Sequence, residues 1–284
     1  MQVGIFCGFS ANTPPAQIAA MARAIEERGF HGIWVPEHVV LFEQYASKYP
    51  YSEDGRLPGF SGGIMEPFAA LAFVAAHTQT IRLGTSICLV PQRNPVYTAK
   101  QVADVDFLSG GRFDFGVGIG WLKEEFDALQ TPWARRAARV REHVAVMRSL
   151  WCDEVSSFRG ELYTLPPCVQ QPKPVQTPHP PIYFGGEGEP ALRRVAEVGQ
   201  GWLGAGLGPD ALPERLSALD QALSTAGRSR DDVRVHIMPN RPAAKDDLVR
   251  YAELGVQQVI YMVGGRDLDG YLRRLDALAG MALT

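Results

Sequence analysis

Apolar runs and segments of helical spacing alternate along the chain. Eight runs rich in Val, Ile and Phe predict strands, which we place at residues 3–9, 32–36, 81–87, 112–117, 182–185, 201–203, 233–238 and 256–262. These runs are continuously apolar rather than alternating, which is typical of parallel strands covered on both faces. The pattern therefore predicts a parallel sheet packed against helices.

The segments between the strands carry helix signals. In the first segment, apolar residues recur at i, i+3, i+4 and i+7, and these are Ile18, Met21, Ala22 and Ile25. Further helix starts, in which proline follows a polar residue, are Glu66-Pro67, Asn94-Pro95 and Glu189-Pro190. Eight strand–helix units in 284 residues favour the α/β class and a single domain, residues 1–284, folded as a closed (β/α)8 TIM barrel. An open doubly wound sheet is disfavoured, because residues 8–12 after the first strand lack the G-x-G-x-x-G fingerprint.

Two segments interrupt the alternation. Residues 40–64 form a long polar and aromatic loop after the second strand, and loops of this length in compact domains are often functional. Residues 151–180 are interpreted as an insertion between strands four and five. We expect a hairpin at residues 155–165 and a proline-rich stretch at residues 166–181 within this insertion.

Charge and composition narrow the possible partners. A formal net charge of −3 supplies no basic field, so we expect no nucleic-acid partner. The longest apolar run, near residues 68–76, is too short to cross a bilayer, and the chain begins with no signal-peptide pattern. The four cysteines, far apart and without a C-x-x-C pair, are Cys7, Cys88, Cys152 and Cys168. We read them as reduced thiols and expect a cytoplasmic protein without a membrane partner.

Histidine spacing gives no metal site. The six histidines are His31, His38, His77, His143, His179 and His236, and none forms an H-x-H or H-E-x-x-H pattern. Of these, we place only His38 and His236 near strand ends. No metal is therefore predicted.

In a barrel of this kind the active site lies at the carboxyl ends of the strands. Glu37 and His38 follow the second strand, where such a pair can take part in acid–base chemistry or hydrogen-bond a heteroaromatic ring. A solvated loop pair is the alternative. Thr85 and Ser86 end the third strand, where small hydroxyl residues allow a flat ligand to come close, although ordinary strand packing explains them equally well.

Glycines mark two further strand ends. Gly116, Gly118 and Gly120 leave the backbone of the fourth strand bare, and glycine in a strand costs stability unless something must approach the backbone closely. The turn Gly185-Gly186-Glu187-Gly188 leads from the fifth strand into a helix. Such a turn predicts an anion site for the phosphate of a cofactor, and the alternative is a plain tight turn.

Several motifs together resemble the luciferase-like monooxygenase superfamily. They are Pro36-Glu37-His38, residues 81–86, 91–95, 99–101, 106–112 and 116–121, Pro172-Lys173-Pro174, and residues 180–186 and 199–202. Leu108-Ser109-Gly110-Gly111-Arg112 followed by Gly116-Val117-Gly118-Ile119-Gly120-Trp121 is the most specific part of this resemblance. Pro91-Gln92-Arg93 and Tyr49-Pro50-Tyr51 look most like a branch of probable oxidoreductases that use coenzyme F420, a 5-deazaflavin.

The resemblance implies a role for each candidate residue. His38 and Glu37 would face the reacting edge of the cofactor ring and serve catalysis. A non-proline cis peptide at Ser86-Ile87 would lie under the ring. The remaining cofactor contacts implied are Thr85, Ser86, Ile87, Gly118, Gly120 and Trp121 around the ring and its chain, and Gly185, Gly186, Glu187 and Gly188 at the phosphate. Residues 40–64 would cover a small-molecule substrate.

The function implied is hydride transfer between coenzyme F420 and a small organic substrate. An FMN-dependent monooxygenase and a non-catalytic flavin or deazaflavin binder are the alternatives. Departures from the family pattern are Glu37 where many relatives have Asp, Asn94 where many have His, and Trp121 where some deazaflavin enzymes have a catalytic Glu. Because Trp121 stands there, both a catalytic carboxylic acid at this position and a sugar-phosphate dehydrogenase activity are in doubt.

The substrate and the assembly are less constrained. The aromatic residues that suggest an apolar or planar substrate are Tyr45, Tyr49, Tyr51, Phe60 and Trp121. Alternatively, these residues pack the long loop down. A homodimer is expected because relatives are often dimers.

Overall fold

The computed structural model describes residues 1–58, 62–265 and 267–283, and it is a closed barrel of eight parallel strands. The barrel strands are β1 (Gln2–Phe6), β2 (Gly32–Val35), β3 (Arg82–Thr85), β4 (Phe113–Val117), β7 (Ile182–Gly185), β8 (Gly201–Ala205), β9 (Arg234–Met238) and β10 (Gln258–Met262). The barrel closes because β1 pairs with both neighbours, Gly4 lying opposite Gly32 of β2 and Ile260 of β10. The predicted (β/α)8 barrel is confirmed. Phe60, one of the aromatic candidates, lies outside the described residues.

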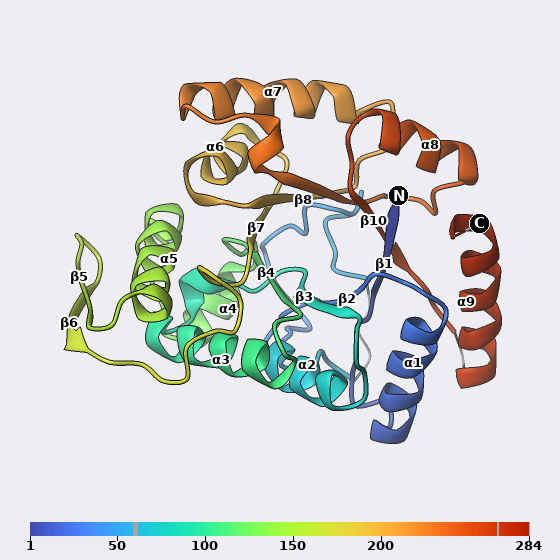
Figure 1. Ribbon diagram of the computed structural model, residues 1–284, viewed down its shortest axis with the longest axis horizontal. Helices are drawn as coiled ribbons and strands as arrows, with labels where there is room; N and C mark the ends of the chain where they lie inside the picture. The colour runs from blue at the N-terminus through green and yellow to red at the C-terminus, as the bar shows by residue number, and fades with distance from the viewer. Residues whose placement is uncertain (59–61, 266, 284) are drawn as a thin grey trace.

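Helices form the outer layer around the strands (Figure 1). They are α1 (Pro15–Glu27), α2 (Pro67–Ala76), α3 (Pro95–Leu108), α4 (Lys123–Ala128), α5 (Arg136–Cys152), α6 (Glu189–Val198), α7 (Leu212–Thr225), α8 (Lys245–Glu253) and α9 (Leu268–Ala282), with 3-10 turns η1 (Val90–Gln92) and η2 (Arg230–Asp232). The predicted starts of α2 and α3 carry caps, since Glu66 accepts from the Ala69 N–H at 2.8 Å and Asn94 accepts from the Val96 N–H at 2.9 Å.

Two predicted strands run at least two residues past the carboxyl ends of the observed strands. The first ends at Phe6, because the chain then leaves the sheet and the Phe9 carbonyl accepts from the Met65 N–H of the long loop at 2.9 Å. The third ends at Thr85, and the peptide bond between Ser86 and Ile87 is cis, as the family resemblance implies.

The insertion between β4 and β7 contains the predicted hairpin, which extends further than expected. Its strands are β5 (Ser156–Arg159) and β6 (Thr164–Cys168), paired antiparallel outside the barrel. Pro166 and Pro167, assigned from the sequence to the proline-rich stretch, therefore belong to β6. A two-stranded sheet tolerates proline because each strand has one edge that needs no hydrogen-bond donor.

Large side chains fill the interior of the barrel. Trp34, Tyr183 and His236 are fully buried there, and the Tyr183 and His236 rings stack with centroids 4.6 Å apart. Gly84 and Gly201 make room for them, since a Cβ at Gly84 would lie 2.4 Å from Trp34 and one at Gly201 would lie 2.0 Å from Tyr183. His236 is therefore a core residue rather than a residue of the mouth, which corrects its predicted place near a strand end.

Candidate active site at the barrel mouth

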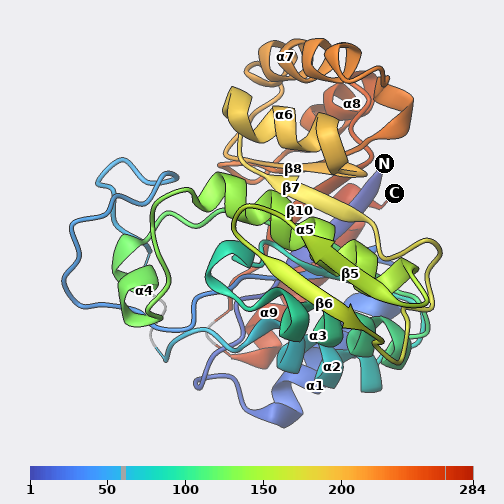
Figure 2. The same cartoon turned by 90° about the vertical axis from the view of Figure 1, so that its left-hand side faces the viewer.

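His38 lies at the carboxyl end of β2 in contact with two residues that follow β4. Its Nδ1 is 3.0 Å from Oε2 of Glu125 in α4, and its Nε2 accepts from the indole Nε1–H of Trp121 at 3.3 Å. Glu37 is 3% and His38 is 8% exposed, so the pair is not a solvated loop feature. Figure 2 shows α4 and the long loop after β2 together on one side of the barrel.

The Glu37 carboxylate has two structural partners. One oxygen accepts from the Leu89 N–H at 2.5 Å, and the other accepts from Nε of Arg93 at 2.6 Å. Arg93 also pairs with Glu66 and donates to Gln101 at 2.9 Å. The predicted catalytic role of Glu37 finds no support in this geometry, because its carboxylate ties the end of β2 to the segment that follows β3.

The end of β3 divides into a packed part and a partly exposed part. Thr85 is fully buried and its hydroxyl donates to the Gly116 carbonyl at 2.7 Å, which is the ordinary packing alternative. Its predicted contact with the cofactor therefore lacks an accessible group. Ser86 and Ile87 are partly exposed at the mouth, beside the cis bond, and Cys88 resumes pairing with Val117 of β4.

The glycines at the end of β4 are explained by the protein's own packing. A Cβ at Gly116 would lie 1.8 Å from the Thr85 carbonyl oxygen, and one at Gly118 would lie 1.9 Å from Cδ1 of Ile87. Gly120 has φ +77°, and a Cβ there would lie 2.7 Å from Phe126. A close neighbour, as anticipated from the sequence, is therefore the segment 85–87 at the end of β3, for both Gly116 and Gly118. Contact of Gly118 and Gly120 with a cofactor stays a prediction.

The glycine-rich turn after β7 opens directly onto the N-terminus of α6. Gly188 is the N-cap residue and, within the described chain, no side chain caps this helix. A Cβ at Gly188 would have as its nearest described neighbour Cδ of Pro190, at 3.6 Å. Gly186 adopts φ +108°, a conformation that favours glycine. Pro190 has no N–H and the Ala191 N–H donates to the Gly188 carbonyl at 2.8 Å, so the Glu189 N–H is the first-turn group that faces no described acceptor. The phosphate site at this turn stays a prediction.

Glu187 does not join this anion site through its side chain. Its carboxylate accepts from the Ala205 N–H at 2.7 Å and from the Tyr51 hydroxyl at 3.2 Å. Burial raises the pKa of Glu187 above its ordinary value, against the opposing effect of these hydrogen bonds. Glu187 therefore uses its carboxylate to join the long loop to the end of β8, and its expected contact with a cofactor stays a prediction.

Aromatic rings pack the long loop onto Trp121. The Trp121 centroid lies 5.7 Å from that of Tyr45 and 5.2 Å from that of Tyr49, and Tyr49 lies 5.5 Å from Tyr51. The described aromatic residues thus satisfy the packing alternative and together form one wall beside His38.

A second carboxylate of α4 anchors the same loop. Glu124 accepts from the Ala46 N–H at 2.7 Å and from the Ser47 N–H at 3.3 Å. Partial desolvation raises the pKa of Glu124, but the hydrogen bonds from Ser47 and from backbone N–H groups outweigh it and lower that pKa to about 2. Glu124 and Glu125 therefore hold two successive parts of the chain after β2.

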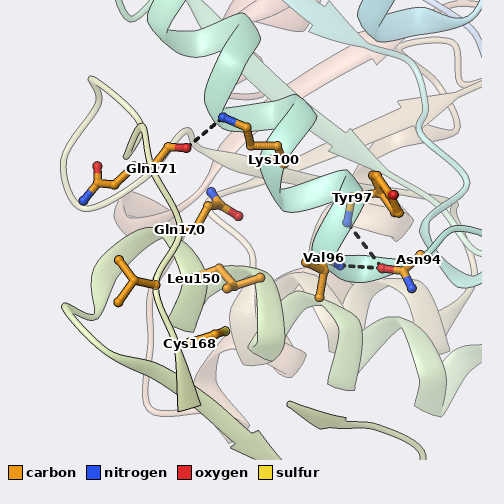
Figure 3. A pocket seen from close by; sticks show the side chains of 9 residues that line it. Asn94, Val96, Tyr97, Lys100, Leu150, Cys168, Gln170 and Gln171 are labelled. Carbon is orange, nitrogen blue, oxygen red and sulfur yellow. Dashed lines mark hydrogen bonds between the residues drawn. The ribbon is translucent and has the colours of Figure 1, made fainter. Parts of the chain in front are cut away.

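Two surface cavities lie away from this mouth. One of about 480 Å³ lies between α3, α5 and the end of β6 (Figure 3), and one of about 520 Å³ lies between α6 and α7. Asn94 borders the first cavity and uses its side chain to cap α3, so the departure from histidine at this position affects a helix start.

Neither a metal-binding cluster nor a membrane-spanning helix is present in the described ranges. Across residues 1–58, 62–265 and 267–283, no group of three or more His, Cys, Asp or Glu side chains is arranged to hold a metal ion. In the same ranges, no helix has the length and apolar character needed to cross a membrane. Cys7, Cys88, Cys152 and Cys168 are free thiols.

Relatives exist across most of the chain. An uncharacterized protein of Mycobacterium tuberculosis is 33% identical over 264 residues, covering 91% of this chain and 92% of the relative. The F420-dependent glucose-6-phosphate dehydrogenase of Kineococcus radiotolerans is 30% identical over 224 residues, covering 77% and 61%. The pyrimidine monooxygenase RutA of Allorhizobium ampelinum is 34% identical over 148 residues, covering 50% and 40%.

Solved structures share the fold at low identity. The coenzyme F420 dependent tetrahydromethanopterin reductase from Methanopyrus kandleri gives a TM-score of 0.78 at 16% identity, covering 100% of this chain and 99% of that one. The FMN complex of the oxygenating constituent of 3,6-diketocamphane monooxygenase from Pseudomonas putida gives 0.66 at 18% identity, covering 83% and 66%. The family model for luciferase-like monooxygenase matches residues 1–273. The chain therefore belongs to the luciferase-like monooxygenase family.

Proposed function

We propose that this protein transfers a hydride between coenzyme F420 and a small organic substrate, with His38 handling the accompanying proton. The observation that carries the proposal is a buried imidazole at the mouth whose Nε2 has an indole N–H as its described partner. An imidazole in this state can accept a proton from a substrate hydroxyl group, which is the proton that must leave when an alcohol becomes a carbonyl.

The proposed proton transfer balances the redox change. In the oxidation of an alcohol, the carbon loses a hydride and the oxygen loses a proton, which His38 Nε2 takes up. The deazaflavin, when bound, supplies the hydride-accepting chemistry. In the direction of reduction, the imidazolium form of His38 returns the proton to the developing alkoxide.

The open N-terminus of α6 fits the phosphate of such a cofactor. The Glu189 N–H and the helix dipole favour an anion there, and the glycine at the N-cap leaves the approach clear. Ile87 and Trp121 offer apolar surface to a flat ring at the same mouth. The aromatic wall supports a planar or apolar substrate.

The share of this chain that each relative covers favours the deazaflavin. The F420-dependent dehydrogenase aligns with 77% of this chain, whereas the pyrimidine monooxygenase aligns with 50%. An FMN-dependent monooxygenase is the second candidate. The fold that this chain shares with a monooxygenase in complex with FMN favours this candidate. A protein that binds a cofactor without turnover is the third.

Fluorescence titration with coenzyme F420 and, separately, with FMN tests the proposal. Micromolar or tighter binding of F420 with much weaker binding of FMN is the expected result. Preference for FMN would favour the monooxygenase, and binding of neither would refute both. His38→Ala should lower turnover with cofactor affinity retained, and unchanged turnover would exclude His38 as the proton-handling residue.

A further inference from the structure

We infer that Glu125 is a positioning residue that fixes the tautomer of His38, so that Nδ1 carries the proton and Nε2 presents a lone pair at the mouth. The inference rests on the proposed role of His38 in proton transfer. It adds a residue of α4 to a site that the sequence motifs confine to the strand ends. Its test below does not require turnover.

Both contacts of the His38 ring favour the same tautomer. An indole N–H is a donor only, so the Trp121 contact at 3.3 Å requires Nε2 to be an acceptor. In a neutral imidazole the other nitrogen then carries the proton. Nδ1 lies 3.0 Å from Oε2 of Glu125, and a carboxylate can accept that proton's hydrogen bond.

The Glu125 carboxylate is itself held rigidly. Its side chain is 1% exposed, and Oε1 accepts from the Val39 N–H at 2.6 Å and from the Val40 N–H at 3.4 Å. The same carboxylate therefore orients the His38 ring and the backbone that follows His38. Because its described contacts are with His38 and this backbone, we expect it to act on the substrate only through His38.

This arrangement supports proton uptake at Nε2. When Nε2 accepts a proton, the ring becomes positive and its Nδ1–H bond to the carboxylate becomes charge-assisted, which strengthens it. The Trp121 contact is long for a hydrogen bond, so a substrate hydroxyl can replace it at Nε2. The opposite tautomer would place two N–H groups against each other at His38 and Trp121.

Glu125→Gln reverses the preference at Nδ1. The Val39 N–H requires an acceptor, so the amide oxygen of the new side chain stays at the position of Oε1. The amide NH2 group then points at Nδ1 as a donor, and the ring must place its proton on Nε2 to accept it. The substitution keeps the size of the side chain, removes its negative charge and reverses the hydrogen-bond polarity of the atom that faces Nδ1.

Long-range proton–nitrogen correlation spectra of the full chain, labelled with nitrogen-15 in histidine and free of cofactor, report the tautomer directly. The His38 signals are assigned with His38→Gln. In the wild type we expect a protonated Nδ1 and an unprotonated Nε2, and in Glu125→Gln the reverse or a mixture. Glu124→Gln is the matched control, because Glu124 binds Ala46 and Ser47 of the same loop and makes no described contact with His38.

A second variant keeps the inference testable if Glu125→Gln does not fold. Trp121→Phe removes the donor to Nε2 and keeps an aromatic ring, so His38 should retain its Nδ1 proton through Glu125 alone. A wild type with its proton on Nε2, an unaltered tautomer in Glu125→Gln, or a reversed tautomer in Trp121→Phe would each overturn the inference. Failure of F420 and FMN to bind would instead refute the proposed function and leave these spectra informative.

Discussion

Ile87 occupies the space that a side chain at Gly118 would need. The ideal Cβ position at Gly118 lies 1.9 Å from Cδ1 and 2.9 Å from Cγ1 of Ile87. The same isoleucine lies 3.0 Å from the ideal Cβ position of Gly185, so one side chain after β3 packs over a glycine that follows β4 and over the last residue of β7. The position of Ile87 at the mouth, and hence the surface offered to a cofactor ring, depends on these glycines.

Gly118→Ala is expected to destabilise the fold by about 1–3 kcal/mol, because a packed side chain must move to admit the methyl group. Ile87→Ala removes the side chain beyond Cβ and should relieve the steric clash, because Cβ of Ile87 lies 3.7 Å from the ideal Cβ position of Gly118. Chemical denaturation of Gly118→Ala, Ile87→Ala and the double variant measures the coupling. Equal costs of Gly118→Ala in both backgrounds would contradict this account of the glycine.

The alternation of continuous apolar runs with segments of helical period was sufficient to predict the barrel. A parallel strand buried on both faces appears in the sequence as one continuous run of apolar residues. All eight barrel strands were located in this way, and the errors occurred at the strand ends. Strand ends depend on long-range contacts such as that of Phe9 with Met65, which local sequence does not reveal. Pro166 and Pro167 misled the prediction because proline disfavours central strands, whereas β6 has a free edge.

The site was only partly predictable, because its contacts join distant parts of the chain. Glu125 is 87 residues from His38 and falls in the first turn of a short helix, where an acidic residue is ordinary. No local signal separates it from Glu124. The glycines were recognised as places of close approach, but the neighbour of Gly118 is Ile87, which a pattern along one strand cannot identify.

Arg93→Met should destabilise the protein by about 3–5 kcal/mol, because it leaves the Glu37 carboxylate buried without its cation. The Glu37 side chain is 1% exposed, and its Arg93 contact is 2.6 Å. Glu37→Gln removes the charge and can still accept from the Leu89 N–H. The double variant should therefore be more stable than Arg93→Met in urea unfolding, and a double variant less stable than either single change would refute the charge explanation.

Because His236 is buried as a neutral ring, the free energy of unfolding should fall as the pH falls below about 6.5. Burial lowers the pKa of His236 from 6.5 to about 3, so between these values the unfolded chain binds a proton that the folded protein excludes. The stability is thus present above pH 6.5 and is lost as the pH falls toward 3. Unfolding free energies at pH 7, 6 and 5 should fall less steeply in His236→Gln, by up to about 1.4 kcal/mol per pH unit. Parallel pH dependences in the two proteins would show that His236 does not titrate in this way.

Gly188→Asp should separate cofactor binding from stability at the N-terminus of α6. Gly188 has φ −77° and ψ 154°, which any residue can adopt, and aspartate is a favoured N-cap because its carboxylate can accept from the Ala191 N–H at the third helical position. The new carboxylate should raise stability by about 0.5–1 kcal/mol while it occupies and repels the site of a phosphate. Thermal unfolding and the fluorescence titration measure the two effects on one protein.

Gly188→Ala is the matched control for this test, since its methyl group meets Pro190 at an ordinary contact distance of 3.6 Å and adds no acceptor. We expect the alanine variant to bind the cofactor with nearly unchanged affinity and the aspartate variant to bind at least tenfold more weakly, because a like charge meets the phosphate where the wild type offers N–H groups. Retained affinity in Gly188→Asp, together with its increased stability, would mean that the helix is capped as designed and that the phosphate binds elsewhere. Equal losses in both variants would attribute the effect to bulk near the glycine-rich turn rather than to the electrostatics of the helix N-terminus.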